Sequence, residues 1–209
     1  MKELPILMNE RSVKAILAGT QTQDRRPVRP QLLGQMTGAV PWADGLWRIE
    51  HGPMDAAIGQ YVGLRVRCPY GRVGDRLWVR ETHAYPVTVL GAPNYLRMTD
   101  GEPVIFRTDV QSPPGGYTKW RPSIHMPRWA CRILLDVKRV WVERVQDITE
   151  ADAKAEGVCK PICDCGECED NTYRGMYHNL MIDIYGHDLW DNNHWMFACE
   201  FEVRKTDDD

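Results

Sequence analysis

The stretch that decides the fold spans residues 16–26 and reads ILAGTQTQDRR. Its apolar residues continue one face of a helix that we expect over residues 9–18, with Asn9 as the N-cap. Gly19 suits the left-handed conformation that commonly ends a helix. We therefore expect a helix, then a short polar loop that ends in two arginines, and then an extended path imposed by Pro27.

A second stretch, residues 74–82, reads GDRLWVRET and predicts a turn that leads into a strand. Alternating apolar and polar residues predict strands at 61–67, 76–81, 103–107, 131–142 and 194–203. A second short helix begins after Thr149 and ends at Gly157. Residues 31–60 lack periodicity and predict irregular structure with a short strand near 46–49. These elements predict an α+β protein with short flanking helices and a small, mostly antiparallel β-barrel as its centre.

Length and composition favour one domain of moderate size, since 209 residues with 43% hydrophobic residues can form a single core. The N-terminal apolar run is too short for a signal peptide, and no segment approaches the ~20 apolar residues of a membrane span. We therefore expect a cytoplasmic protein with no membrane partner. The oligomeric state stays open.

The charge is unevenly distributed along the chain. Residues 1–145 carry 21 Lys and Arg against 13 Asp and Glu, a net charge of +8, whereas residues 146–209 carry a net charge of −11. The basic N-terminal part indicates a polyanion such as RNA as a partner. An ordinary mixed surface with an acidic tail explains the same numbers, so charge alone leaves both interpretations open.

Several motifs follow one another in a specific order: the Gly19-x-x-Thr22 loop with Arg26, the Gly74-Asp75 turn, the helix over 149–156 and an aromatic closing strand. This order resembles the ASCH domain family, which belongs to the PUA-like superfamily of β-barrels associated with RNA and modified nucleosides. Further stretches are similar to a longer subgroup of bacteriophages and prophages, at residues 68–71, 78–82 and 120–130. The resemblance implies one domain over residues 1–209 in a bacterial host cell, with insertions at about 31–60, 83–118 and 158–190.

The resemblance also implies a chemistry. A small bacterial member of the superfamily is an amidohydrolase that removes the acetyl group from acetylated cytidine with a lysine, a threonine and a glutamate. Those three positions fall on Gln21, Asp24 and Glu156 in this chain. Because two of the three residues differ, we expect recognition of RNA or a modified nucleotide or nucleobase in a basic cleft. The alternatives are a hydrolase, either an amidohydrolase or a ribonuclease, with Asp24 or Glu156 as the base, and a protein-interaction module.

The polar loop supplies the first candidate ligand contacts. Thr20, Gln21 and Thr22 can form hydrogen bonds to a base or a phosphate, and Arg25 and Arg26 can neutralise a phosphate. Binding residues concentrate in loops that a rigid scaffold positions. The structural alternative is a helix end followed by a turn whose arginines are simply solvated.

Further candidates lie on the strand over 76–81 and in the segment that precedes the strand over 131–142. Trp78 and Arg80 share one face of their strand and could stack on a base and pair with a phosphate, while Glu81 points to the other face. A buried tryptophan and a structural ion pair are the alternative. His125 could contact a ligand or act as a base, although a single histidine is more often structural.

Four cysteines crowd into ten residues and indicate a metal loop. Cys159, Cys163, Cys165 and Cys168 provide the four thiolates that a structural zinc site needs. Because we expect no secretion signal, a disulfide framework is disfavoured for these cysteines. Unligated, reduced cysteines in a flexible insertion are the alternative. The other three cysteines lie in or beside predicted strands, which indicates core positions: Cys68, Cys131 and Cys199.

Overall fold

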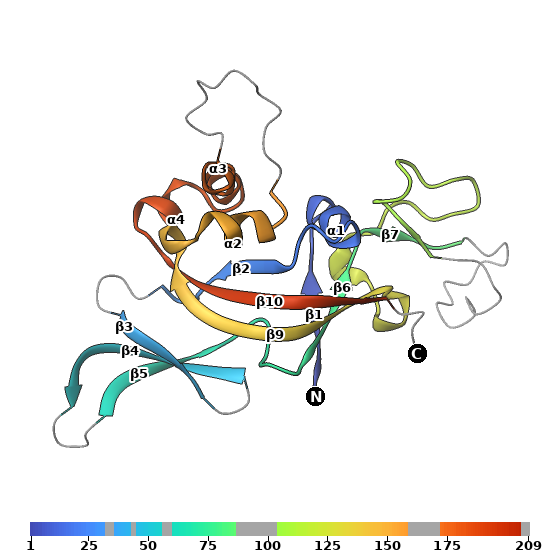
Figure 1. Cartoon of the computed structure of the whole chain (residues 1–209). Helices are drawn as coiled ribbons and strands as arrows, with labels where there is room; N and C mark the ends of the chain where they lie inside the picture. Colours follow the sequence, from blue (N-terminus) through green and yellow to red (C-terminus); the bar gives the residue numbers. More distant parts are fainter. Residues whose placement is uncertain (32–35, 43–44, 56–59, 87–103, 159–171, 206–209) are drawn as a thin grey trace.

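The computed structural model describes residues 1–31, 36–42, 45–55, 60–86, 104–158 and 172–205. Figure 1 shows two layers of β-sheet, with most of the helices on the far side of the larger sheet from the smaller one. The larger sheet has the strand order β1-β6-β9-β10-β2, and the smaller has the order β3-β4-β5. Their bounds are β1 Glu3–Leu7, β2 Gln23–Pro27, β3 Met36–Pro41, β4 Leu46–Asp55, β5 Gln60–Arg67, β6 Arg76–Arg80, β9 Ile133–Arg144 and β10 Trp195–Lys205.

The larger sheet is antiparallel except at one edge. β1 and β6 run parallel, whereas β6 with β9, β9 with β10 and β10 with β2 are antiparallel. A further antiparallel pair joins β7 His83–Ala84 to β8 Ile105–Phe106. The chain is therefore an α+β protein dominated by antiparallel sheet. Closure of these strands into a barrel stays a prediction.

Alternation of apolar and polar residues predicts the long strands correctly. β5, β6, β9 and β10 cover the segments predicted at 61–67, 76–81, 131–142 and 194–203. The segment predicted at 103–107 contains only the two-residue strand β8. The alternation of residue types is matched most clearly by burial in β6, where buried and half-buried residues alternate along the strand.

Two predictions of irregular structure are wrong. β3, β4 and β5 follow one another in the chain and form an antiparallel sheet within and beyond the segment 31–60, in which β3 pairs with β4 and β4 with β5. The short strand predicted near 46–49 is confirmed as part of β4. The polar loop after Gly19 becomes β2 from Gln23 onward, with Arg25 opposite Ala198 of β10. Tertiary pairing outweighs the low strand propensity of a charged sequence in this segment.

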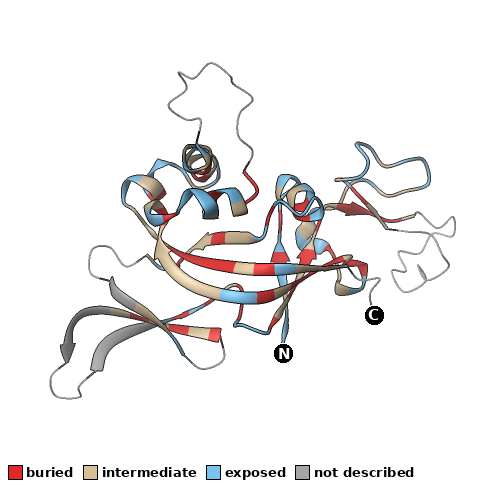
Figure 2. Ribbon diagram, in the orientation of Figure 1, coloured by how far each residue is buried: buried red, intermediate tan, exposed pale blue. Residues whose placement is uncertain are grey.

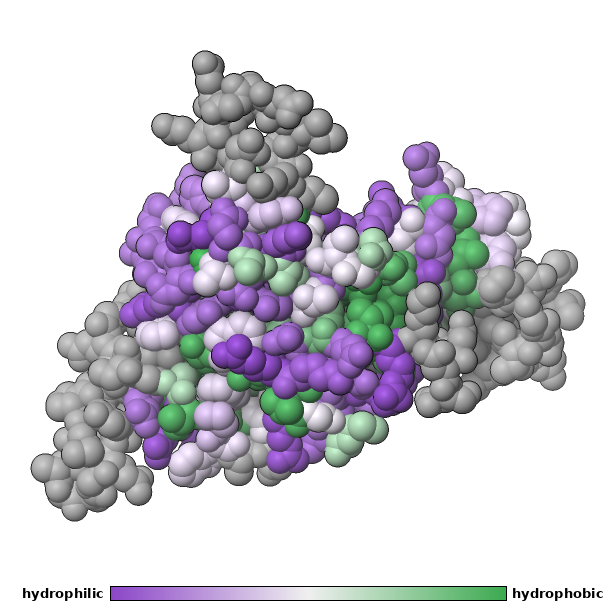
Figure 3. Space-filling model, in the orientation of Figure 1, coloured by the Kyte–Doolittle hydropathy of each residue, from purple (hydrophilic) through white to green (hydrophobic). Residues whose placement is uncertain are grey.

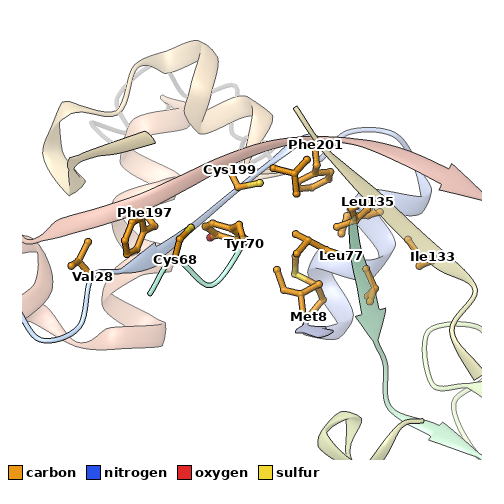
Figure 4. Packing of buried hydrophobic residues seen from close by; sticks show 14 of the residues in the cluster. Met8, Val28, Cys68, Tyr70, Leu77, Ile133, Leu135, Phe197, Cys199 and Phe201 are labelled. Carbon is orange, nitrogen blue, oxygen red and sulfur yellow. The ribbon is translucent and has the colours of Figure 1, made fainter. Parts of the chain in front are cut away.

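β10 separates two hydrophobic clusters. Phe197 and Cys199 face the cluster between the two sheets, and Met196 faces the cluster under the helices. Figure 4 shows Phe197, Cys199 and Phe201 of β10 gathered with Cys68 and Tyr70. In Figure 2, buried residues follow β10 and the first part of β9. Cys68, Cys131 and Cys199 are all buried, which confirms their prediction as core residues.

Both predicted helices are confirmed. α1, Glu10–Leu17, has Asn9 as its N-cap, whose side chain accepts a hydrogen bond from the backbone N of Ser12. α2, Glu150–Ala155, has Thr149 in the same role for Asp152. In each helix a side-chain oxygen satisfies a backbone donor that would otherwise be unpaired.

Two further helices, which the sequence analysis did not predict, lie beside α2: α3 Tyr173–Tyr185 and α4 His187–Asp191. Tyr177 and Met181 lie one turn apart on α3 and are buried against Met196 of β10 and Leu189 of α4. The surface over these helices is mainly hydrophilic in the view of Figure 3. None of the helices in the described part of the chain has the length and apolar character that crossing a bilayer requires.

Gly157 sits at a close contact between three segments of the chain. Its φ is +72°, and a Cβ placed on it would lie 2.9 Å from the Cβ of Ala15 and 2.9 Å from the Cβ of Gln21. This contact brings the end of α2 against the end of α1, where the backbone N of Thr22 donates to the carbonyl of Ala155. Gly157 therefore fixes the distance between Gln21 and Glu156.

We predict that Gly157→Ala destabilises the fold more than Gly19→Ala. Gly19 has a similar φ of +71° but nothing within 4 Å of the added Cβ, so its substitution measures backbone strain alone. Backbone strain should cost each variant ~1–2 kcal/mol, and overpacking should add ~1–3 kcal/mol at Gly157 only. Urea unfolding of both variants measures the difference, and equal losses would contradict the close contact.

Candidate functional site

A cleft of about 240 Å³ lies where α1, β2, the end of α2 and α3 meet. Its polar side is formed by residues around β2 and the end of α2, at Gln21, Asp24, Arg25, Arg26 and Glu156. The start of α1 adds further polar groups at Asn9, Arg11 and Ser12. A mainly apolar wall comes from α3, at Leu180, Met181, Ile184 and Tyr185.

The alternation of β2 directs its charged side chains to opposite faces of the sheet. Gln23 and Arg25 turn toward α2, where Gln23 donates to Asp152 at 3.0 Å. Asp24 and Arg26 turn toward the core between the sheets, where Asp24 accepts from the hydroxyl of Tyr70 at 2.9 Å. Because β2 is an edge strand of the larger sheet, residues from both faces of β2 reach the same cleft.

Arg25 is the centre of the buried polar network. Its side chain is fully buried, and its Nε lies 2.6 Å from Oε1 of Glu143 while its Nη1 lies 2.7 Å from Oε1 of Glu156. Nη1 also donates to Oε1 of Gln23 at 2.8 Å. Burial by itself lowers the pKa of Arg25, but attraction to Glu156 and Glu143 outweighs it and raises the pKa, so the guanidinium is permanently charged.

Glu156 shares this one cation with other carboxylates. Burial raises its pKa from 4.5 to about 7, because the loss of solvation outweighs the attraction of Arg25, and the carboxylates of Asp24 and Glu143 repel a further negative charge. Glu156 therefore exchanges a proton near neutral pH. A carboxyl group in this state can act either as an acid or as a base.

Two residues of the cleft have a buried polar atom without a hydrogen-bond partner among the described residues. Gln21 is 2% exposed, and its Nε2 donates to the carbonyl of Gln23, which leaves its Oε1 unpaired. Nη2 of Arg25 has no hydrogen bond either, since Asp152 lies 3.9 Å away. One unpaired acceptor and one unpaired donor in a buried site cost free energy unless something binds them.

Asp24 and Arg26 form a second, smaller network beside the first. Nε of Arg26 lies 2.9 Å from Oδ2 of Asp24, and its Nη2 donates to the carbonyl of Leu7 at 2.6 Å. Burial and the charge of Asp24 raise the pKa of Tyr70 well above its ordinary value, so its hydroxyl stays protonated and donates to Asp24. The position of Arg26 at the edge of the cleft is therefore fixed from two sides.

The structure brings together five of the sequence-predicted site residues, which line this one cleft: Gln21, Asp24, Arg25, Arg26 and Glu156. They include Gln21, Asp24 and Glu156, the three positions that correspond by resemblance to the catalytic residues of the amidohydrolase. Thr20 and Thr22 are exposed and lie outside the lining; the Thr20 hydroxyl donates to the carbonyl of Ala15. Arg25 differs from its expected role, since it is buried in ion pairs rather than presented to solvent.

The candidates from β6 and from the segment before β9 do not line this cleft. Arg80 donates to the carbonyls of Met126 and Ile124 and stacks on the ring of Trp78. Glu81 is buried and pairs with Arg132 at 2.8 Å. Their role in binding a ligand stays a prediction. His125 is exposed and lines a separate cavity with Arg121 and Trp129.

The apolar wall of the cleft comes from α3, a helix that was not predicted. Tyr177, Met181 and Tyr185 recur at intervals of four, which is the spacing of one face of a helix. That pattern could have predicted both the helix and its inward face. The helix lies within the insertion expected at about 158–190, and the helical spacing of these residues is the more specific signal.

The predicted zinc ligands cannot be placed against the cleft. Cys159, Cys163, Cys165 and Cys168 all lie in the segment 159–171, outside the described residues. Within the described ranges no group of three or more His, Cys, Asp or Glu side chains is arranged to hold a metal ion. The structural zinc therefore stays a prediction from cysteine spacing.

We predict that Arg25→Ala destabilises the protein by ~3–5 kcal/mol, because it leaves the buried carboxyl group of Glu156 and the partly buried one of Glu143 without their cation. Arg26→Ala is the matched control: its side chain is 28% exposed, and the loss should be about 1 kcal/mol. Chemical denaturation compares the two variants. A loss for Arg25→Ala no larger than that for Arg26→Ala would contradict the central role of Arg25.

We predict that the contribution of Glu156 to stability falls as the pH rises. Its pKa in the folded state is about 7 against an ordinary value of 4.5, so the folded protein holds the proton more tightly than the unfolded chain. The contribution is complete below about pH 4.5 and is lost through pH 7, by on the order of 3 kcal/mol.

The difference in unfolding free energy between the wild type and Glu156→Gln measures the contribution of the Glu156 carboxyl group to stability. The wild type should lose stability relative to the variant between pH 4.5 and 7.5. A difference that is constant over this range, or that changes in the opposite direction, would show that the raised pKa of Glu156 is wrong.

Comparison with known proteins does not assign this site. No family model, no curated protein and no solved structure matches the chain. The function must therefore be inferred from the cleft itself: its shape, its buried Arg25–Glu156 pair and the polar atoms of Gln21 and Arg25 that have no partner in the described structure.

Proposed function

We propose that the cleft between α1, β2 and α3 binds a nucleobase, either of RNA or of a modified nucleotide. The observation that carries this proposal is a pair of buried, unpaired atoms, Gln21 Oε1 and Arg25 Nη2, in two residues that line one cleft. A nucleobase edge presents a hydrogen-bond donor beside an acceptor. Such an edge supplies a partner for both atoms at once.

The size and the walls of the cleft support a planar, partly apolar ligand. Its volume of about 240 Å³ lies just below the range of roughly 300–1,000 Å³ that is typical of drug-sized ligands. Leu180, Met181 and Ile184 form an apolar surface opposite the polar groups of β2. A base could therefore lie with its face against α3 and its edge toward Gln21 and Arg25.

The resemblance to the ASCH domain agrees with this proposal in one respect. The three positions that the resemblance assigns to chemistry, Gln21, Asp24 and Glu156, line the same cleft. We include the PUA-like β-barrel, an RNA partner and the cytoplasm of a bacterial host in the proposal on the strength of the resemblance. A protein-interaction role has no observation of its own to favour it.

A hydrolase is the second candidate function, and the raised pKa of Glu156 favours it. A general base works best when its pKa is near the working pH, and the pKa of Glu156 is about 7. Glu156 could activate a water molecule, and Arg25 Nη2 could stabilise the oxyanion that forms on an amide carbonyl. Gln21 cannot serve as a cation, which is why binding is the first proposal.

We predict that nucleosides bind to the wild type and that Ile184→Trp weakens this binding by about tenfold or more, since a larger side chain fills the cleft. Ile124→Trp is the matched control: Ile124 is 54% exposed and Ile184 is 47% exposed, and only Ile184 lines the cleft. Calorimetric titration with the common nucleosides and acetylated cytidine measures the affinities.

The titration has two outcomes that would count against the proposal. One is the absence of binding by any nucleoside to the wild type, and the other is an equal loss in the two tryptophan variants. Incubation with acetylated cytidine distinguishes a hydrolase from a protein that only binds. If the wild type releases acetate and Glu156→Gln does not, the protein is a hydrolase.

A further inference from the structure

A second cavity, of about 340 Å³, adjoins the nucleobase cleft. Arg26 and Tyr185 line both cavities, so the two lie side by side. The second cavity adds Arg29, which follows β2, and Arg67, which ends β5. Residues from three distant parts of the chain thus form one continuous surface with the cleft.

The two cavities differ in charge. The nucleobase cleft contains the carboxyl groups of Asp24 and Glu156 beside its arginines, whereas the second cavity has three arginines and no acidic residue in its lining. Arg29 and Arg67 are both exposed, and neither forms an ion pair with a residue that the structure describes. Within the described part of the chain, no carboxylate pairs with these two charges, which leaves them to attract an anion.

The three arginines have the chemistry that phosphate requires. A guanidinium donates several hydrogen bonds in a planar fork that matches the oxygens of a phosphate. Arg26 is held in place by Asp24 and by the carbonyl of Leu7, so part of this site is already ordered. Ordered donors bind an anion more tightly because less side-chain entropy is lost.

We propose that the cavity formed by Arg26, Arg29 and Arg67 binds the phosphate of a nucleotide whose base occupies the adjoining cleft. This inference rests on the proposed function and narrows its ligand from a nucleoside to a phosphorylated nucleotide. The phosphate can belong to a free nucleotide or to the backbone of RNA, since both present the same oxygens. Arg26 and Tyr185 lie where the ribose connects the base to the phosphate.

Affinities of the wild type and of Arg29→Gln/Arg67→Gln for three ligands test the proposal: a nucleoside, its 5′-monophosphate and a single-stranded oligoribonucleotide. The wild type should bind the monophosphate about tenfold more tightly than the nucleoside, as expected for charge-assisted hydrogen bonds to one phosphate. The double variant should lose this difference and keep its affinity for the nucleoside. Arg72→Gln/Lys138→Gln is the control, since both residues are exposed and line neither cavity.

The outcomes separate this inference from the proposed function. A nucleoside that binds without any gain from its phosphate, or a gain that survives in the double variant, overturns the phosphate site and leaves nucleobase binding intact. Binding of the monophosphate and of inorganic phosphate that depends on Arg29 and Arg67, without binding of the nucleoside, supports the phosphate site and overturns the proposed function. Failure of all these ligands overturns both.

The oligoribonucleotide distinguishes the two sources of the phosphate. If RNA is the ligand, its affinity should fall in the double variant and its dependence on salt should become less steep, because fewer counterions are released on binding. If a free nucleotide is the ligand, the monophosphate alone should respond to the substitutions. Either response supports the phosphate site. If the affinity of neither ligand changes in the double variant, the phosphate site is contradicted.

Discussion

The structure around the candidate site depends on one buried interaction, the contact of the Arg25 guanidinium with the carboxyl groups of Glu143 and Glu156. It joins β2 to β9 and to the end of α2. Removing a charged side chain from water costs free energy that a single ion pair rarely returns in full. The network is therefore better explained by what it positions than by what it adds to stability. It places Glu156 beside Gln21 in a buried position. Burial there outweighs the attraction of Arg25 and, with repulsion from Asp24 and Glu143, raises the pKa of Glu156 to about 7.

The fold creates this arrangement by using β2 as the last strand of the larger sheet. Side chains from both faces of an edge strand can reach the same opening, so Asp24 and Arg25 line one cleft although they are adjacent in sequence. The close contact at Gly157 holds the end of α2 against the end of α1. β10 contributes residues to both hydrophobic clusters, and each cluster includes a residue that lines the cleft, Met8 in one and Met181 in the other.

Sequence analysis predicted the parts of this structure that depend on local pattern. The caps at Asn9 and Thr149, the long strands and the buried cysteines follow from residue type and period, and the structure confirms them. The pairing of β2 with β10 depends on a distant partner, so no local pattern predicts it. The sheet of β3, β4 and β5 pairs neighbouring segments, but residues 31–60 show no clear alternation from which β3 could be predicted. The same limit applies to the site: Gln21, Asp24 and Glu156 were candidates, but the burial of Arg25 results from contacts with residues 118 and 131 positions away. Substituting Arg25 would therefore disturb folding as well as binding, which makes Arg29 and Arg67 the cleaner probes of charge.

The central claim is that Gln21 Oε1 and Arg25 Nη2 are the contact points for a nucleobase edge. A crystal structure of the protein with a bound nucleotide measures this directly. The account predicts that a donor of the base lies within about 3 Å of Gln21 Oε1 and an acceptor within about 3 Å of Arg25 Nη2, the usual hydrogen-bond distances. A nucleotide bound elsewhere on the protein, with both atoms still unpaired, would contradict it.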